Sequence, residues 1–248
     1  MEPDSTSVCS ARRADRMMIV ACGIVLLSLM MNEPHHSTVQ HKETLRILAL
    51  GDSYTIGESV EPHERFPDQL AAALRSRGLA VAELVVLART GWTTDELNAA
   101  IDEHHPTGTF DLVTLLIGVN NQYRGRSVDE YRLEFVALLQ RAIAFAGMNP
   151  RRVLVLSIPD WGVMPFADGR DRAKISLEID AFNAVNWEES VRAGAQYIDI
   201  TPISREAQRL PDLIAPDGLH PSAVQYAAWV ALIVPKALKA LSHSLRDE

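Results

Sequence analysis

The residues that could do chemistry lie in short polar groups, each beside an apolar stretch of the chain. Ser53 ends a Gly-Asp-Ser group after the apolar run 45–50, and Asp217 precedes His220 by three residues, before the apolar stretch 221–243. A serine hydroxyl becomes a nucleophile when a neutral imidazole accepts its proton, and a carboxylate beside the imidazole fixes its tautomer and stabilises the imidazolium. These residue types fit nucleophilic catalysis. The alternatives are that the serine only caps a helix and that Asp-Gly only forms a turn.

Two further groups could supply hydrogen-bond donors. Gly91 follows the apolar run 82–87, and Asn120 follows the run 112–117 within Gly-Val-Asn-Asn. A tetrahedral oxyanion needs convergent donors, which a backbone N–H at a glycine and an asparagine amide both provide without adding charge. Turn chemistry is the alternative for both residues. No lysine follows the glycines as in a phosphate-binding loop, and the serine is not in a G-x-S-x-G elbow.

The elements that must position these groups alternate along the chain. The short apolar runs are typical of buried strands, and most of them are followed along the chain by a stretch with helical spacing. The expected strands are 45–50, 82–87, 112–117, 153–157 and 197–200, and the expected helices are 66–77, 94–103, 128–145, 175–193 and 221–243. This alternation predicts βαβ units, with helices on both faces of a parallel sheet. Ligands bind such sheets at the carboxyl ends of the strands, where the polar groups are expected to meet.

Composition and charge narrow the class of protein. The chain has 248 residues, 47% hydrophobic and 23% charged, which excludes a disordered chain, a collagen-like fibre and a multi-span membrane protein. Its net charge of −8 argues against a nucleic-acid partner. Cys9 and Cys22 are the only cysteines, and the His104-His105 pair lacks the spacing of a zinc hydrolase. We therefore expect neither a metal nor a cofactor.

The N-terminal residues 1–43 differ from the rest. Arg12, Arg13 and Arg16 precede the uncharged run 17–31, a pattern typical of a secretory signal or a short membrane anchor. A helix of this run is about 22 Å long against a hydrocarbon core of ~30 Å, and no clear cleavage site follows. We expect a signal or anchor with a linker over 1–43 and a catalytic domain over 44–248, exported and either membrane-anchored or periplasmic or extracellular. A buried helix of the fold is the alternative for the run 17–31.

Taken in order, the four groups resemble those of the SGNH hydrolases, the GDSL-type esterases and lipases. The similarity covers about residues 45–245, and it implies a three-layer α/β/α fold with a five-stranded parallel sheet, as in flavodoxin-like proteins. Tyr54 stands where the family motif often has leucine. Asn121 stands where an acidic residue is common, which leaves the supporting role of that position open.

The resemblance also implies a role for each residue of the site. Ser53 would be the nucleophile, His220 the general base and Asp217 its orienting partner. The oxyanion hole would consist of the backbone N–H groups of Ser53 and Gly91 and the side-chain amide of Asn120. The implied activity is that of a serine ester hydrolase without a metal or cofactor.

The substrate is less determined than the chemistry. We expect a small-molecule or carbohydrate ester, with an exported carbohydrate O-acetyl esterase as the leading hypothesis and a lysophospholipase or acyl thioesterase next. A catalytically inactive binding protein on the same fold is the alternative of another class. Five aromatic residues near the motifs could line the crevice, but for any single one packing in the core or in a lid is the expectation: Tyr54, Trp92, Tyr123, Trp161 and Phe166. Arg124 and Arg126 are expected to be solvated loop charges, with contact to an anionic group as the alternative.

Overall fold

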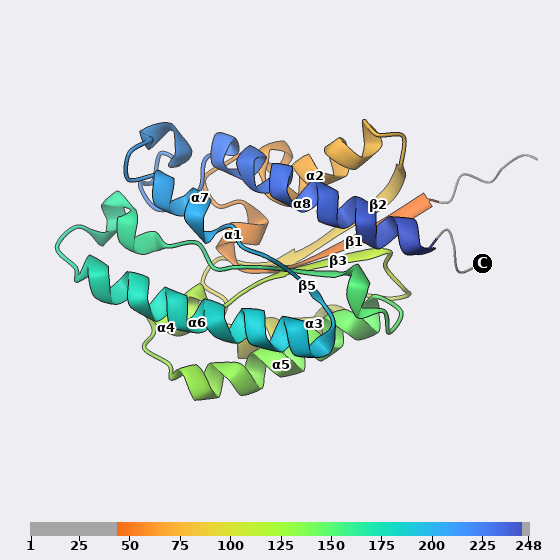
Figure 1. The fold of residues 1–248 in the computed structure, drawn as a ribbon, viewed down its shortest axis with the longest axis horizontal. Helices are drawn as coiled ribbons and strands as arrows, with labels where there is room; N and C mark the ends of the chain where they lie inside the picture. The colour runs from red at the N-terminus through yellow and green to blue at the C-terminus, as the bar shows by residue number, and fades with distance from the viewer. Residues whose placement is uncertain (1–43, 245–248) are drawn as a thin grey trace, which may run out of the picture. The chain divides into compact units, whose positions relative to one another are not determined.

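The computed structural model describes residues 44–244, with side chains as far as residue 242, so the expected anchor and linker of residues 1–43 lie outside the described residues. Within the described part, five parallel strands form one sheet in the order β2-β1-β3-β4-β5 (Figure 1). The strands are β1 (Thr44–Gly51), β2 (Ala80–Ala88), β3 (Leu112–Leu116), β4 (Val153–Leu156) and β5 (Gln196–Ile198). All five expected strands are confirmed, with ends that differ by up to two residues.

Helices cover both faces of the sheet (Figure 1). One face carries α2 (Phe66–Arg75), α7 (Thr201–Glu206) and α8 (Ala223–Ser244), and the other carries α3 (Thr94–His104), α5 (Val128–Phe145) and α6 (Arg172–Ala193). Two short helices, α1 (Ser53–Ile56) and α4 (Val119–Tyr123), directly follow β1 and β3. The expected three-layer α/β/α fold is therefore confirmed.

Local sequence explains where these elements begin and end. Strands β3 and β4 are buried along their whole length, which accounts for their unbroken apolar sequences. Helix α3 begins with a capping box between Thr93 and Glu96, and α5 begins where the Ser127 side chain accepts a hydrogen bond from the N–H of Glu130. Helix α6 ends at Gly194, whose φ of 77° is the left-handed conformation that glycine adopts without strain.

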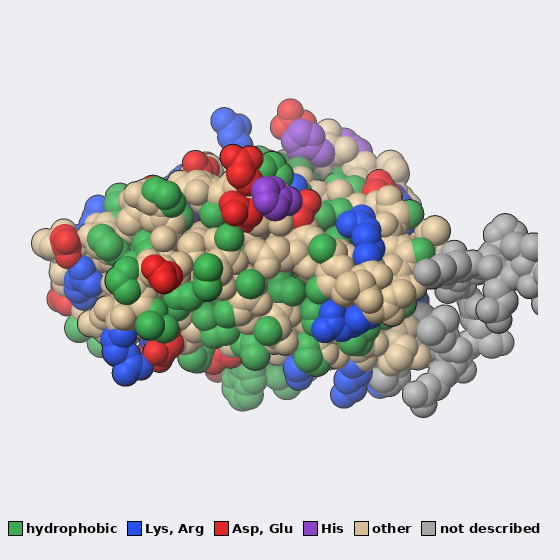
Figure 2. Space-filling view, turned by 90° about the horizontal axis from the view of Figure 1, so that it is seen from above, with side chains coloured by type: hydrophobic (Ala, Val, Ile, Leu, Met, Phe, Trp, Pro, Cys, Tyr) green, Lys and Arg blue, Asp and Glu red, His purple; other side chains and the backbone are tan. Residues whose placement is uncertain are grey.

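Helix α8 is the most apolar helix of the described residues, and the only one of them long and apolar enough to cross a membrane by length and composition. Half of its stretch Ala223–Ser242 is buried. Tyr226 and Trp229 are fully buried and contact Phe66 of α2. Figure 2 looks onto this side of the molecule, where hydrophobic side chains spread over the middle of the face.

The start of α8 corrects one expectation. Pro221 does not open the helix, because it forms an isolated antiparallel bridge with Ile214, and α8 begins at Ala223. This bridge fixes the end of the loop that carries Asp217 and His220. The short helices α1, α4 and α7 were not predicted, since four to six residues are too few to show a helical period.

Candidate active site

An open pocket of about 210 Å³ lies at the carboxyl ends of β1, β2 and β3. Its lining includes Ser53, Gly91, Asn120 and His220, which come from four separate stretches of the chain. The structure therefore brings together the polar groups that the sequence singles out. Of the five aromatic residues near the motifs, Tyr54, Tyr123, Trp161 and Phe166 line the pocket, whereas Trp92 packs against the hydrophobic core instead.

Ser53 is the first residue of α1 and is 5% exposed. The N-cap of this helix is Asp52, whose Oδ1 accepts a hydrogen bond of 3.0 Å from the N–H of Tyr54. The turn before it needs glycine, because a Cβ at Gly51 would lie 2.4 Å from the carbonyl oxygen of Leu116. The first N–H groups of a helix have no partner within the helix, so the N–H of Ser53 is available to a ligand.

Asp52 itself is fully buried beside Ser53. Burial raises the pKa of its carboxyl to about 7, although backbone hydrogen bonds favour the charged form. The protonation state of a buried carboxyl next to Ser53 therefore changes near neutral pH. Sequence reasoning assigned this residue no role, because a Gly-Asp-Ser group by itself does not show how deeply the carboxyl is buried.

His220 and Asp217 form a hydrogen-bonded pair. Nδ1 of His220 lies 2.5 Å from Oδ2 of Asp217, and Oδ1 accepts hydrogen bonds from the N–H groups of Leu219 at 2.9 Å and His220 at 3.0 Å. The hydroxyl of Ser59 also donates to Oδ2, at 2.7 Å. Burial opposes the charged carboxylate, but these hydrogen bonds outweigh it and lower the pKa of Asp217 to about 2. A charged carboxylate at Nδ1 favours the tautomer in which Nε2 is free to accept a proton.

Two residues hold the loop that carries Gly91. Asn120 lies in α4, and Arg124 directly follows this helix. Arg124 Nη2 donates to the carbonyl oxygen of Gly91 at 2.7 Å, and Asn120 Nδ2 donates to the carbonyl oxygen of Trp92 at 2.9 Å. Gly91 has a φ of 87°, and a Cβ there would meet only Arg124 Nη2, at 4.0 Å. Glycine is therefore required by the backbone conformation and not by lack of space. The two expected oxyanion donors are linked to each other through these hydrogen bonds.

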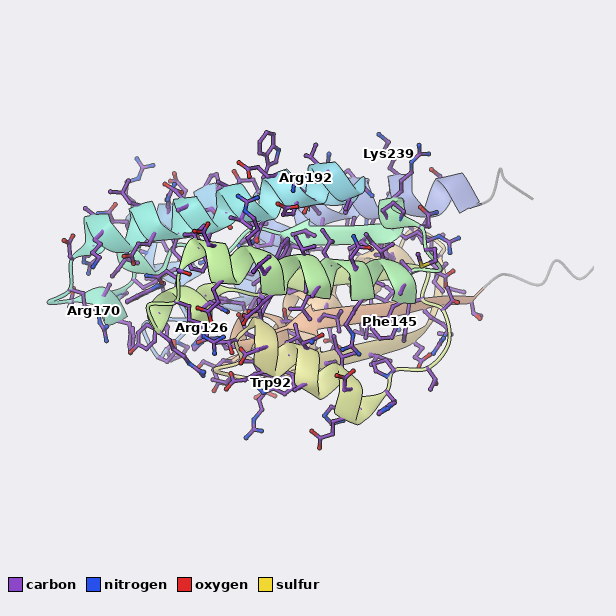
Figure 3. All side chains as sticks on the ribbon, turned by 90° about the horizontal axis from the view of Figure 1, so that it is seen from below. Trp92, Arg126, Phe145, Arg170, Arg192 and Lys239 are labelled. Carbon is purple, nitrogen blue, oxygen red and sulfur yellow. The ribbon has the colours of Figure 1, made fainter. Side chains whose placement is uncertain are left out.

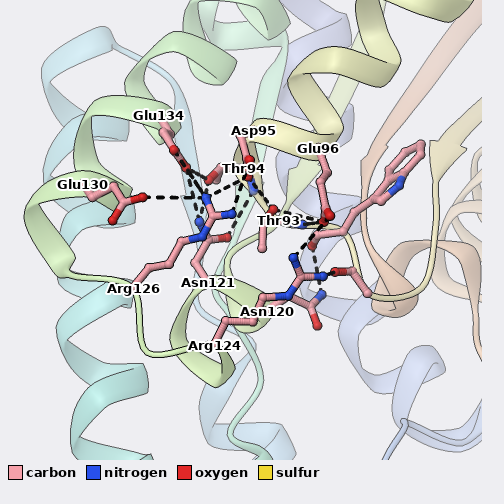
Figure 4. A network of polar contacts seen from close by, with 12 residues as sticks. Thr93, Thr94, Asp95, Glu96, Asn120, Asn121, Arg124, Arg126, Glu130 and Glu134 are labelled. Carbon is pink, nitrogen blue, oxygen red and sulfur yellow. Dashed lines mark hydrogen bonds and ion pairs between the residues drawn. The ribbon is translucent and has the colours of Figure 1, made fainter.

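A polar network fixes α4 to the start of α3 (Figure 4). Asn121 is fully buried, and its Oδ1 accepts from the N–H of Thr94 at 3.1 Å. Its Nδ2 donates to Thr94 Oγ1 at 2.6 Å and to Glu134 Oε2 at 3.3 Å. The carboxylate missing from position 121 is thus supplied by Glu134 of α5. The role of Asn121, left open by the sequence, is to join two elements that border the pocket.

Arg124 and Arg126 are partly solvated, with side chains 42% and 22% exposed, and both also form ion pairs that we did not expect. Arg124 forms an ion pair with Glu96 at 3.2 Å, and Arg126 pairs with Asp95 at 2.8 Å and with Glu134 at 3.4 Å (Figure 4). Glu96 and Asp95 are 28 and 31 residues from their arginines, so no local signal points to these two pairs. The contribution of Glu134 has no sequence signal either.

The model of the GDSL-like Lipase/Acylhydrolase family matches residues 49–228, about three quarters of the chain. The chain belongs to the GDSL-like lipase/acylhydrolase family. It is therefore an ester-bond hydrolase by family, and the resemblance found in the four motifs is confirmed. No curated protein sequence matches the chain significantly.

Solved structures of other esterases share the fold of this GDSL-like hydrolase. Esterase EstA from Pseudoalteromonas sp. is 18% identical, with a TM-score of 0.57, and the match covers 80% of this chain and 99% of EstA. The acetylxylan esterase Axe2 from Geobacillus stearothermophilus is 17% identical, with a TM-score of 0.59 and coverage of 79% and 94%. The lipase/acylhydrolase from Enterococcus faecalis is 21% identical, with a TM-score of 0.58 and coverage of 78% and 95%. At these identities the likeness concerns the fold.

One wall of the pocket in this GDSL-like hydrolase is aromatic. Tyr123, Trp161 and Phe166 form a cluster with ring centroids 5.5 to 6.5 Å apart. Trp161 is buried, and its Nε1 donates to Gln122 Oε1 at 2.9 Å, whereas Tyr123 and Phe166 are 48% and 42% exposed. The wall is therefore anchored at its base and open to solvent at its rim. Among the described residues, no group of three His, Cys, Asp or Glu side chains could hold a metal ion.

Proposed function

We propose that this protein is a serine ester hydrolase in which Ser53 is the nucleophile, His220 the general base and Asp217 the residue that orients His220. The observation that supports this most strongly is that Ser53 and His220 line one pocket, while Asp217 is hydrogen-bonded to His220 from outside it. Gly91 and Asn120 line the same pocket, where donors to an oxyanion are needed.

The proposed reaction has two steps. Ser53 Oγ attacks the acyl carbonyl carbon as its proton passes to Nε2 of His220, and the carbonyl oxygen becomes an oxyanion. His220 then gives this proton to the leaving alcohol, so that the acyl group remains on Ser53. A water molecule, deprotonated by His220, attacks the acyl-enzyme and releases the acid and Ser53. Asp217 stays charged and stabilises the imidazolium in both steps.

The oxyanion of both steps needs hydrogen-bond donors. The N–H groups of Ser53 and Gly91 and the second N–H of the Asn120 amide are proposed for this role, since the first N–H of that amide donates to Trp92. Preorganised donors of this kind typically contribute about 10²–10³ each to the rate. The ion pairs around α4 keep these donors in place before the substrate arrives.

The proposed substrate is a short acyl ester of a small molecule or carbohydrate, with an O-acetylated carbohydrate as the leading candidate. The pocket of about 210 Å³ suits a small acyl group with part of its alcohol. Axe2, which is named as an acetylxylan esterase, has the same fold over most of its length. Its name supports a carbohydrate ester for this chain only by analogy.

A serine-directed fluorophosphonate tests the proposed nucleophile. The wild-type protein should gain one adduct, and peptide mass spectrometry should place it on Ser53. Ser59→Ala serves as the matched serine variant, because Ser59 contacts Asp217 but is not proposed to react. Labelling of the Ser53→Ala variant at the wild-type rate would contradict the assignment. Release of acetate from acetylated sugars, tested beside acyl-CoA and lysophospholipids, identifies the substrate class.

We also propose that the catalytic domain is exported and that residues 1–43 act as an anchor or signal, without a nucleic-acid partner. The support is the order of Arg12, Arg13, Arg16 and the uncharged run 17–31, because basic flanks tend to stay on the cytoplasmic side. Protease treatment of spheroplasts should digest the domain of an anchored chain. A full-length chain in the soluble cytosolic fraction would contradict export.

A further inference from the structure

Arg170 is an exposed residue that lies against the aromatic wall of the pocket without itself lining the pocket. Its Cζ lies 5.3 Å from the ring centroid of Tyr123, 5.3 Å from that of Trp161 and 5.4 Å from that of Phe166. Its Nη2 also donates to the hydroxyl of Tyr123 at 3.2 Å. All three rings line the pocket, so the guanidinium lies beside its aromatic wall. Figure 3 shows Arg170 at one end of the molecule, opposite the end that carries Lys239.

Within residues 44–242, no carboxylate forms an ion pair with Arg170. The two nearest acids in sequence are already engaged, because Asp168 pairs with Arg172 at 2.5 Å and Asp171 Oδ1 accepts from the N–H of Lys174 at 3.0 Å, at the start of α6. Arg124, by contrast, is neutralised by Glu96. Arg170 is thus an exposed cation beside the pocket whose charge is not balanced by a neighbour.

The aromatic cluster prepares Arg170 for binding. Its contacts with the three rings are cation–π contacts, which attract the guanidinium to the cluster and restrict its motion. A guanidinium held in this way loses less conformational entropy when it pairs with an oxyanion, and its planar N–H groups match the two oxygens of such a group. Only one of its N–H groups is used by Tyr123.

We propose that Arg170 binds an anionic oxygen group, a carboxylate or a phosphate, on the ester substrate. This inference rests on the proposed function, since the ester is the substrate that reaches Ser53. The anionic group would lie at the aromatic rim of the pocket while the acyl carbonyl lies between Ser53, Gly91 and Asn120. The preferred esters would therefore be anionic, in spite of the net negative charge of the chain.

Matched acetate esters test this proposal. The esters are 4-acetoxybenzoate, 4-acetoxyphenyl phosphate and the neutral methyl 4-acetoxybenzoate, and the measured quantity is the ratio of kcat/KM for each anionic ester to that for the neutral ester. Arg170→Ala should lower this ratio about tenfold, mainly through KM, because a charge-assisted hydrogen bond is lost. Arg170→Lys should keep part of the preference. The larger loss, for carboxylate or for phosphate, identifies the group.

A control variant removes the same charge elsewhere. Arg209→Ala deletes a cation that is 75% exposed and pairs with Glu206 in a segment that does not line the pocket. Its ratio should equal that of the wild type, and the wild-type preference should fall as salt is added. An unchanged ratio in Arg170→Ala, or an equal loss in Arg209→Ala, would overturn the proposal.

A binding measurement separates this proposal from the proposed function. In the Ser53→Ala background, calorimetry compares 4-hydroxybenzoate with the neutral 4-hydroxybenzamide. We expect the anion to bind about 5- to 20-fold more tightly, and the difference to disappear in the Ser53→Ala/Arg170→Ala double variant. Equal binding of both ligands while the wild type hydrolyses esters would refute the role of Arg170 alone. The opposite outcome would refute the esterase proposal alone. In that outcome the anion binds more tightly than the neutral ligand, but Ser53 of the wild type does not react with the fluorophosphonate.

Discussion

The carboxylate of Asp217 lies 2.5 Å from the imidazole Nδ1 of His220 and also accepts the backbone N–H of the same histidine at 3.0 Å. Asp217 therefore fixes both the ring and the main chain of the residue proposed to move the proton. The separation of three residues makes this possible, because the loop turns at Gly218, with a φ of 73°. The pair depends on local geometry, whereas its approach to Ser53 depends on the whole sheet.

Replacing Asp217 tests this arrangement. Asp217→Asn should lower kcat for p-nitrophenyl acetate by about 10²–10⁴ with little change in KM, because the amide favours the wrong tautomer and does not stabilise the imidazolium. Asp212→Asn is the matched control, since it removes an exposed carboxylate of the same segment. If both variants lose activity equally, Asp217 does not act through His220.

The two acids of the site should affect stability with opposite dependence on pH. For Asp52, the folded pKa of about 7 lies above the ordinary aspartate value of 3.8, so the folded state binds more protons between these values. Its contribution to the free energy of unfolding is largest below pH 4 and falls as the pH rises towards 7. For Asp217, the folded pKa of about 2 lies below 3.8, so its contribution is present above pH 4 and is lost as the pH falls through 2.

Urea unfolding of Asp52→Asn and Asp217→Asn between pH 2 and pH 8 measures these contributions. The stability of Asp52→Asn relative to the wild type should rise from pH 4 to pH 7 and then level off. The deficit of Asp217→Asn should be constant above pH 4 and shrink towards pH 2. Differences from the wild type that do not vary with pH would show that neither pKa is shifted.

Arg124 is predicted to be a positioning residue for the oxyanion hole. Arg124→Ala removes the hydrogen bond to the Gly91 carbonyl and should lower kcat about tenfold, with a smaller change in KM, because the Gly91 loop becomes less ordered. Arg124→Lys should restore part of kcat, and thermal melts monitor folding. A change confined to KM would indicate substrate contact instead.

The network around Asn121 predicts that a carboxylate at position 121 is incompatible with the carboxylate of Glu134. Asn121→Asp would place a carboxylate beside Glu134 Oε2, which lies 3.3 Å from Nδ2 of Asn121, in a fully buried position. The free energy of unfolding should fall by about 1–3 kcal/mol, because two carboxylates would then face each other in a buried region and repel. Adding Glu134→Gln to this variant should recover most of the loss. Additive losses in the double variant would show that the two side chains do not interact.

Much of the fold was predictable because the strands are buried and the helices are amphipathic, so both leave periodic patterns in the sequence. Helix α5 begins and ends where expected, and all five strands lie within two residues of their predicted places. The parallel sheet explains why the site residues meet, because the carboxyl ends of its strands lie at one edge. The residues that meet there are Ser53, Gly91, Asn120 and His220.

Other features could not be predicted. The ion pairs of Arg124 with Glu96 and of Arg126 with Asp95 join residues 28 and 31 positions apart, and such pairs leave no pattern in a single sequence. Asp52 is fully buried, and a Gly-Asp-Ser group in the sequence does not show this. Helix α4 is only five residues long, so the Asn pair within it resembles a turn until the third dimension is known.

The kinetics of Ser53→Ala test the central claim most directly. Hydrolysis of p-nitrophenyl acetate by purified wild-type protein and Ser53→Ala, on samples with matching thermal melts, gives kcat/KM for each. We predict a loss of at least about 10³-fold in the variant, because the covalent route is removed while folding is unaffected. Equal kcat/KM for the two proteins would contradict the assignment of Ser53 as the nucleophile, and with it the proposed roles of His220 and Asp217.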